Sequence, residues 1–206
     1  KLISYAKGDY YWLLHHDEFW NKEKDLVGYL IKNIFKRSNK LIILTIQKQT
    51  YYRIFKFKLI INQIHTSFKK QLNQIIKNPK KLINANVFGP PSALIISKEL
   101  KFYYDNSFIF LVDVDLYIRL LEKLNINDIF IINKNHMNII SSQNNKYSIT
   151  NFLKINKHAI KLIEREKLLS IYKYDNNLIK IINSFYFFIL YKSYSILNTR
   201  ILIYRF

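Results

Sequence analysis

A five-residue apolar run near the start of the chain constrains its fold most. Residues 10–14 (YYWLL) are too few for a helix, so they predict a buried strand, and the run stops on four polar residues, His15, His16, Asp17 and Glu18. Open α/β sheets bind ligands beyond the carboxyl ends of their strands, where carboxylate oxygens can hold a divalent metal ion and its phosphate. Asp17 is therefore either a metal ligand or the cap of the helix that follows.

Short apolar runs and amphipathic segments alternate further along the chain. Residues 21–37 repeat apolar positions at helical spacing, with acids early and Lys36 and Arg37 late, which predicts a helix. The other patterns predict strands at residues 41–46, 93–96 and 129–132, and helices at residues 68–76, 116–125 and 158–174. Residues 54–61 fit either a strand or the start of a helix. We expect an α/β fold in which residues 10–14, 41–46 and 93–96 share one mixed sheet and helix 21–37 packs on a face of it.

Composition sets the broad class. The chain has 206 residues, of which 50% are hydrophobic, which is ample for a core. Its longest convincing apolar run, residues 185–191, is shorter than the roughly 20 residues of a membrane span. The absence of cysteine excludes disulfides and thiolate metal sites. Because the chain begins with Lys1 and no signal segment follows, we expect the sequence to be cut at its start.

The charge is strongly positive. Lys and Arg number 33 against 14 for Asp and Glu, a net charge of +19 that favours polyanionic partners. The chain is also rich in Asn, Ile, Tyr and Phe, so the excess reads as a compositional bias across all positions rather than as a basic patch. No helix concentrates Arg and no nucleic-acid-binding motif is present, so nucleic acid is not an expected partner.

Two further motifs stand out, a turn rich in glycine and proline and a pair of aspartates. Gly89, Pro90, Pro91 and Ser92, which we call the GPPS turn, precede an apolar run. Its prolines fix the backbone and its glycine permits a close approach, so it is either a ligand-contacting loop or a plain tight turn. Asp113 and Asp115 stand where the apolar run 108–112 meets an amphipathic helix, and Asp113 is either a functional carboxylate or the N-cap of that helix.

In this order, the motifs resemble those of the family 2 glycosyltransferases of the GT-A fold, from about residue 6 to about residue 143. Residues 6–10 (AKGDY) resemble A-x-G-[DE]-Y, and residues 14–20 (LHHDEFW) resemble the family's L-D-x-D-D-x-W run, which contains its DxD motif. His15 replaces the first acid of that motif, and Glu18 stands where the family has Asp. Residues 89–93 (GPPSA) are similar to G-x-P-S-A, and residues 111–120 (LVDVDLYIRL) to [EV]-D-x-D-x-x-x-R-L.

The resemblance implies an inverting, metal-dependent sugar transfer. Asp17 would coordinate Mg²⁺ or Mn²⁺ near the donor diphosphate, with His15, His16 and Glu18 in the vicinity. Asp113 would be the catalytic base for the acceptor hydroxyl, Asp115 and Arg119 would pair as supports, and the GPPS turn would lie on the acceptor side. His136, in an H-x-x-x-[VI]-[ST] run, would complete the metal or diphosphate site. A competing register puts Asn145 at that position, and a surface loop histidine is the plain alternative for His136.

The family's upstream nucleotide-binding strand and loop are missing from this sequence. The resemblance therefore implies an N-terminally truncated GT-A-like mixed sheet flanked by helices, with a partial catalytic domain at residues 1–174 and a basic, aromatic helical tail at 175–206. The tail either contacts a membrane interface or packs back on the domain. The expected partners are a nucleotide sugar and a glycan or lipid-linked acceptor in cell-envelope polysaccharide biosynthesis, in the cytoplasm or at the inner face of its membrane. The alternative is a non-catalytic basic module that binds an anionic membrane surface or glycan.

Overall fold

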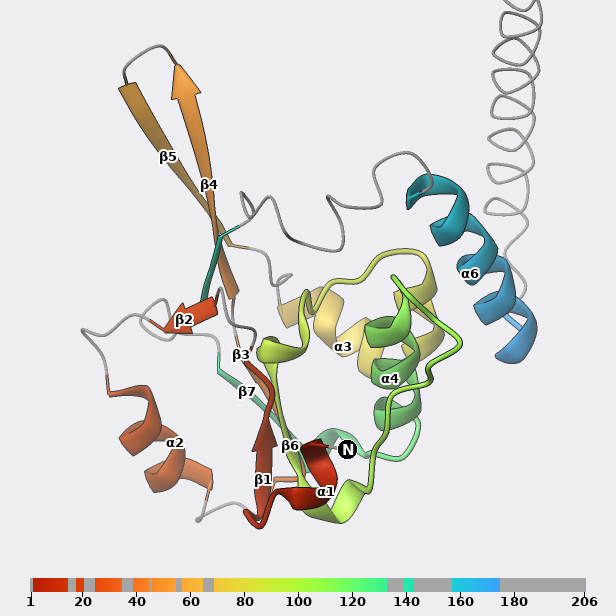
Figure 1. Ribbon diagram of the computed structural model, residues 1–206. Coiled ribbons are helices and arrows are strands. Elements are labelled where there is room, and N and C mark those ends of the chain that lie inside the picture. Colours follow the sequence, from red (N-terminus) through yellow and green to blue (C-terminus); the bar gives the residue numbers. More distant parts are fainter. Residues whose placement is uncertain are drawn as a thin grey trace, which may run out of the picture. The chain divides into compact units, whose positions relative to one another are not determined.

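The computed structural model describes residues 2–14, 18–20, 25–34, 39–44, 46–54, 57–64, 69–132, 139–142 and 157–174 (Figure 1). The chain forms two compact units, Lys1–Phe152 and Leu153–Phe206. The first unit combines two four-stranded sheets with helices, which confirms the predicted α/β class. The predicted boundary at residue 174 remains a prediction from the family resemblance.

The first sheet has the strand order β1-β6-β3-β7. Its strands are β1 (Tyr10–Trp12), β6 (Leu94–Ser97), β3 (Leu41–Leu44) and β7 (Ile129–Ile132). Strand β6 runs antiparallel to β1 and β3, whereas β3 and β7 are parallel, so the sheet is mixed as predicted. The central strands β3 and β6 are fully buried, which explains their continuous apolar sequences.

Strand β1 departs from its prediction in length and burial. Only Tyr10–Trp12 forms the strand, its residues are half-buried, and Leu14 is 40% exposed. The predicted burial of residues 10–14 is therefore wrong. The reason is that β1 lies at the edge of the sheet, where it has one neighbouring strand instead of two.

Helix α2 (Leu26–Ile34) packs on one face of this sheet. Leu26 and Leu30 join a buried cluster with residues of β3, β6 and β7, among them Ile42, Ile95 and Ile132. The predicted packing of a helix from segment 21–37 on the mixed sheet is therefore confirmed. At its start, the side chain of Asp25 accepts a hydrogen bond from the backbone of Gly28 at 2.7 Å, which satisfies one of the open N–H groups of the helix.

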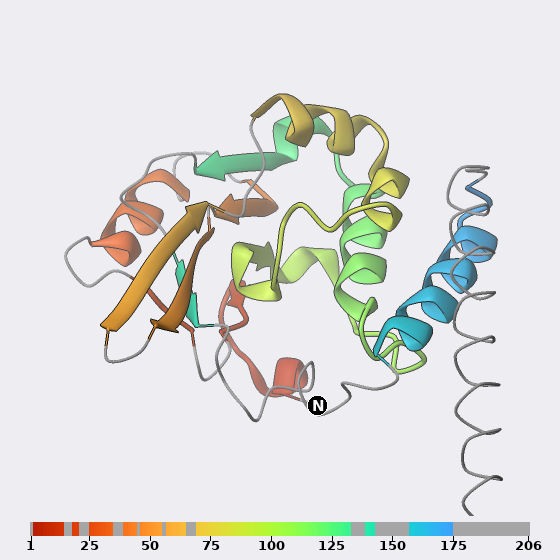
Figure 2. The same ribbon diagram turned by 90° about the horizontal axis from the view of Figure 1, so that it is seen from above.

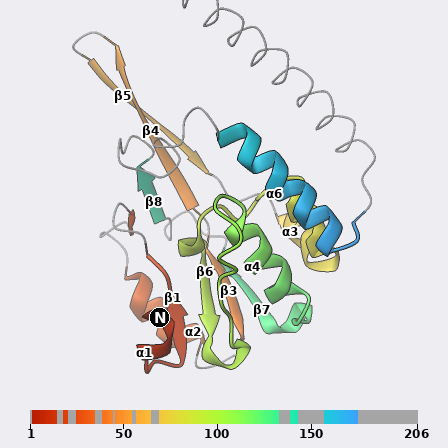
Figure 3. The same cartoon turned by 45° about the vertical axis from the view of Figure 1, so that its right-hand side comes forward.

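The second sheet has the order β2-β8-β4-β5. Its strands are β2 (Glu18–Trp20), β8 (Ile139–Ser142), β4 (Ile46–Ile54) and β5 (Phe57–Ile64). Strands β4 and β5 form a long hairpin, visible in Figure 1 and Figure 3, so the described part of the segment 54–61, Ile54 and residues 57–61, belongs to strands rather than to a helix. Strand β4 follows β3 after one residue and runs parallel to β8, just as β3 runs parallel to β7.

A helical layer lies on the side of the first sheet opposite α2, as Figure 2 shows. It contains α3 (Lys69–Lys77), the short helix η1 (Pro79–Ile83) and α4 (Val112–Leu121), and η1 contacts both of the others. Helix α4 begins earlier than predicted, so both Asp113 and Asp115 lie in its first turn. Other short helices among the described residues of this unit are α1 (Leu2–Tyr5), η2 (Pro91–Ala93), η3 (Lys98–Leu100) and η4 (Ile126–Asp128).

The second unit is described over residues 157–174. It contains helix α6 (Lys157–Ile171), as the sequence predicts, with Leu162, Leu168 and Leu169 buried. The predicted tail, residues 175–206, lies outside the described residues. No helix in the parts of the chain that the structure describes is long and apolar enough to cross a membrane.

Candidate functional site

The GPPS turn is held by its own backbone and by one upstream side chain. Gly89 has φ 85°, a left-handed conformation that favours glycine. The Asn86 side-chain oxygen accepts hydrogen bonds from the backbone N–H groups of Phe88 (3.1 Å) and Gly89 (3.0 Å). Its amide nitrogen donates to the Gly89 carbonyl at 2.9 Å. The turn therefore enters β6 with a fixed shape.

Two aromatic side chains fasten the turn to its surroundings. Trp12, at the end of β1, donates from Nε1 to the Ser92 carbonyl at 2.9 Å. Tyr117, on α4, donates from its hydroxyl to the Gly89 carbonyl at 3.1 Å, and its ring meets the edge of Phe88 with 5.5 Å between centroids. The turn is thus attached on one side to the strand that precedes Asp17 in the sequence and on the other to the helix that carries Asp113.

Asp113 is the second residue of α4. Leu111 occupies the N-cap position, so the alternative in which Asp113 caps this helix is wrong. A carboxylate in the first turn of a helix is nevertheless stabilised by the helix dipole. Burial raises the pKa of the nearby Tyr104 phenol far above its ordinary value, and the negative charge of Asp113 raises it further. Tyr104 is therefore a neutral hydroxyl near the Asp113 charge at physiological pH.

Asp115 and Arg119 form the ion pair that the sequence predicts. The Asp115 carboxylate accepts from Arg119 Nε at 2.9 Å and from Nη2 at 2.7 Å, and its side chain is only 5% exposed. The same Nη2 donates to the Tyr103 carbonyl at 2.8 Å, and the guanidinium lies 4.6 Å from the centroid of the Tyr103 ring. Because Tyr103 precedes Tyr104, this pair holds the segment that places Tyr104 near Asp113.

The predicted metal ligands Asp17 and His136 lie outside the described residues, as do His15, His16 and Asn145. Their flanking strands are described. Glu18, which follows Asp17, pairs with Ser141 across β2 and β8. Within the described ranges, no three His, Asp or Glu side chains gather where they could hold a metal ion. The metal site thus remains a prediction that depends on Asp17 and His136.

Several segments that the motifs single out lie at one edge of the first sheet, where edge here means the side formed by the ends of its strands and not an outer strand. Strands β1, β3 and β7 run in the same direction and end at this edge, and the GPPS turn leads into β6 there. Ile132, the last residue of β7, pairs with Leu44, and Ile139, the first residue of β8, pairs with Ile46. Ile132 and Ile139 stand on either side of the segment that contains His136 in the sequence. Their pairing partners, Leu44 and Ile46, are the two neighbours of Thr45 in the sequence.

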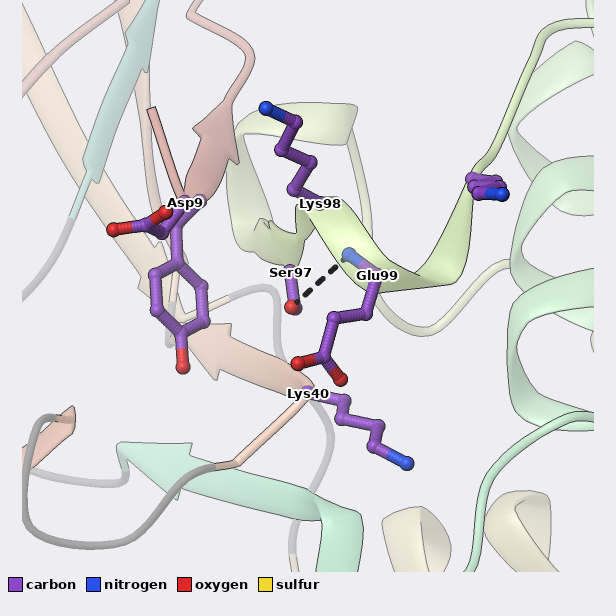
Figure 4. Close-up of a pocket in the computed structure, with 7 residues that line it drawn as sticks. Asp9, Lys40, Ser97, Lys98 and Glu99 are labelled. Carbon is purple, nitrogen blue, oxygen red and sulfur yellow. Dashed lines mark hydrogen bonds between the residues drawn. The ribbon is translucent and has the colours of Figure 1, made fainter. Parts of the chain in front are cut away.

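A cavity of about 400 Å³ opens at the other edge, where β1 and β3 begin. Figure 4 shows Glu99 extending toward Lys40, with Lys98 directed away from both. Its lining residues are Asp9, Tyr10, Lys40, Ser97, Lys98, Glu99 and Lys101. Burial, followed by the charges of Glu99 and Asp9, raises the pKa of the Tyr10 phenol, whose hydroxyl donates to the Asn39 carbonyl at 2.9 Å. None of the predicted site residues lines this cavity.

Comparison with protein-family models, with curated proteins and with solved structures gave no match to this chain. The functional assignment therefore depends on the motifs and on the contacts around the GPPS turn. Three residues that hold the turn, Trp12, Asn86 and Tyr117, were not predicted from the sequence, and neither was Tyr104 near Asp113. Only Tyr117 carried a usable signal, because it stands four residues after Asp113 and so shares its helix face.

Proposed function

We propose that this chain is the acceptor-side part of an inverting, metal-dependent glycosyltransferase of the GT-A type. It would move a sugar from a nucleotide-sugar donor to a glycan or lipid-linked acceptor. The observation that carries this proposal is the double attachment of the GPPS turn, to Trp12 of β1 and to Tyr117 of α4. Because the leaving group and the attacking hydroxyl must meet at one sugar carbon, the strand before Asp17 and the helix of Asp113 have to be fixed relative to each other.

Asp113 is the proposed base. As the acceptor oxygen forms its bond to the sugar carbon, the bond from that carbon to the diphosphate oxygen breaks, and Asp113 takes the acceptor proton. Attack from the side opposite the leaving group inverts the configuration at that carbon. Asp115 and Arg119 position this region through the Tyr103 carbonyl, and the neutral Tyr104 supplies a hydroxyl beside the base.

The donor side of the proposal depends on Asp17 and His136. These residues would hold a Mg²⁺ or Mn²⁺ ion, which when bound would neutralise charge on the donor diphosphate. The topology supports this assignment, because β1 and β7, which precede the two residues in the sequence, end at the same sheet edge as the GPPS turn. His15, His16 and Glu18 belong to the same donor side.

Asparagine substitutions test the two acids separately, with nucleotide-sugar affinity and transfer rate both measured in the presence of Mn²⁺. Asp113→Asn should lower the transfer rate by about 10²- to 10⁴-fold with donor affinity nearly unchanged, because only proton abstraction is lost. Asp17→Asn should weaken donor binding as well, because an amide oxygen lacks the carboxylate charge.

Asp128→Asn is the matched control, since Asp128 belongs to η4 near the opposite edge, where its side chain pairs with Lys40. It should change neither quantity. Transfer at the wild-type rate by Asp113→Asn would rule out the base assignment.

A further inference from the structure

The positive charge of this chain is concentrated in one long segment. Of the 33 Lys and Arg residues, 14 stand between Asp25 and Glu99, and that stretch contains none of the 14 Asp and Glu residues. The whole-chain composition suggests that the excess of positive charge is spread evenly, but its distribution along the sequence is uneven. Within the segment, five lysines gather on α3 and η1, and we call them the lysine surface. They are Lys69, Lys70, Lys77, Lys80 and Lys81.

Helix α3 separates its two faces cleanly. Leu72 and Ile75 are buried in the protein. Gln74 and Lys77 are three residues apart, so they share the other side of the helix, and both are exposed. In η1, Leu82 and Ile83 are buried while Lys81 is exposed. Four apolar residues of this region are thus used for packing and Ile76 is half-buried, whereas Gln74, Lys77 and Lys81 are exposed.

We propose that the lysine surface binds an anionic phospholipid bilayer. Four to eight cations on an amphipathic helix suffice to attract the negative surface of a membrane. Residues 69–83 contain no Arg for bidentate contacts to phosphates or base edges and no aromatic ring for base stacking, which disfavours nucleic acid as the partner. Lysine point charges suit mobile lipid headgroups. A second copy of the chain is disfavoured because its identical surface would repel this one.

The proposal predicts a purely electrostatic attachment. Because Leu72 and Ile75 of α3 are buried and Ile76 is half-buried, the exposed residues Gln74 and Lys77 offer no apolar group for insertion into the acyl chains. Binding should therefore require anionic lipid and disappear at about 1 M salt, where charges are screened over roughly 3 Å. This attachment is independent of the proposed sugar transfer.

Vesicle flotation of the whole chain tests the proposal. Wild type should float with vesicles of equimolar phosphatidylcholine and phosphatidylglycerol and not with phosphatidylcholine alone. Lys77→Glu combined with Lys81→Glu should lower the partition coefficient by about thirty-fold or more, since each lysine near an anionic surface contributes roughly fivefold. Lys80 is half-buried and has interactions of its own, so it is left unchanged.

The matched control is Lys32→Glu combined with Lys98→Glu, which changes the net charge equally at two exposed lysines of α2 and η3. It should retain most of the binding. An equal loss in the control would overturn the proposal, as would unchanged binding of the Lys77/Lys81 variant, which would assign the attachment to another part of the chain. Tighter binding to a DNA or RNA duplex than to the anionic vesicles, at the same salt concentration, would also overturn it.

Discussion

The two edges of the first sheet are built in different ways. At the edge where β1, β3 and β7 end, the GPPS turn is attached by hydrogen bonds from Trp12 and Tyr117. Helix α4, which carries Tyr117, also holds the ion pair of Asp115 and Arg119, in which the Asp115 side chain is only 5% exposed. At the opposite edge a cavity of about 400 Å³ is open. The ion pair there, Lys40 with Asp128, has side chains 42% and 24% exposed and a 3.7 Å separation.

The fixed side-chain contacts and the open cavity thus lie at different edges of the sheet. A reaction that joins two substrates needs groups held within about half an ångström of their working positions, which requires locked side chains and supporting hydrogen bonds. The edge with the GPPS turn has those supports, whereas the edge with the cavity has space and the exposed side chains of Lys98 and Lys101. In this protein the GPPS turn and its fixed contacts lie at one edge, whereas the cavity, lined by Asp9 and Tyr10 of the AKGDY motif, lies at the other.

The largest contrast is expected for the two ion pairs. Arg119→Ala removes the guanidinium that faces the buried Asp115 carboxylate, and such a loss costs about 3 kcal/mol or more. Lys40→Ala breaks an exposed pair, for which about 1 kcal/mol or less is expected. Urea unfolding of both variants measures the two free energies. Equal losses would mean that the two edges do not differ in the way their charges are held.

A smaller contrast is expected between two glycines. Gly89→Ala places a side chain on a residue with φ 85°, which costs about 1–2 kcal/mol. Gly8→Ala, near the edge with the cavity, would bring the new Cβ to 3.4 Å from the Tyr10 carbonyl oxygen, an ordinary contact, so its free energy of unfolding should change little. The same urea experiment compares them. A Gly89→Ala variant as stable as Gly8→Ala would show that the GPPS turn tolerates a different backbone conformation.

Local patterns in the sequence were sufficient for most elements of the fold. The apolar runs at residues 93–96 and 129–132 correspond to β6 and β7, and helical spacing located α2, α3 and α6. The run 41–46 was predicted as one strand of the first sheet, but β3 ends at Leu44 and Ile46 begins β4 of the second sheet. These elements form because each pattern matches the face that the element buries. Strand β1 was expected to be buried because a single run does not show whether its strand has one neighbour or two.

The contacts of the site were less accessible from the sequence. Trp12 and Ser92 are separated by 80 residues, and Tyr117 and Gly89 by 28, so no local pattern connects them. The pairing of Asp115 with Arg119 was predicted because residues four apart share a helix face. The net charge of the whole chain does not show how the charges are distributed. The number of Lys and Arg residues between successive acids does show it, because it reveals the acid-free segment between Asp25 and Glu99 that contains the lysine surface.

The smallest expected effect concerns Tyr104 and appears only in alkaline solution. Its pKa is raised in the folded protein, whereas in the unfolded chain a tyrosine titrates near 10.0. The unfolded chain therefore loses this proton first. The stability that the neutral phenol contributes is complete below about pH 10 and is lost as the pH rises toward the folded-state pKa.

Between about pH 10 and pH 11 this loss amounts to at most about 1 kcal/mol, which Tyr104→Phe should abolish. The free energy of unfolding, measured against pH for wild type and variant, gives the difference directly and cancels the titration of the other tyrosines. Tyr10→Phe is the comparison at the opposite edge, because burial and two carboxylates raise the pKa of Tyr10 too, but its hydroxyl also donates to the Asn39 carbonyl. Its loss should therefore be visible already at neutral pH. Identical alkaline slopes for wild type and Tyr104→Phe would mean that neither burial nor the Asp113 charge raises the pKa of Tyr104. The hydroxyl assigned to the proposed acceptor side would then have to come from another residue.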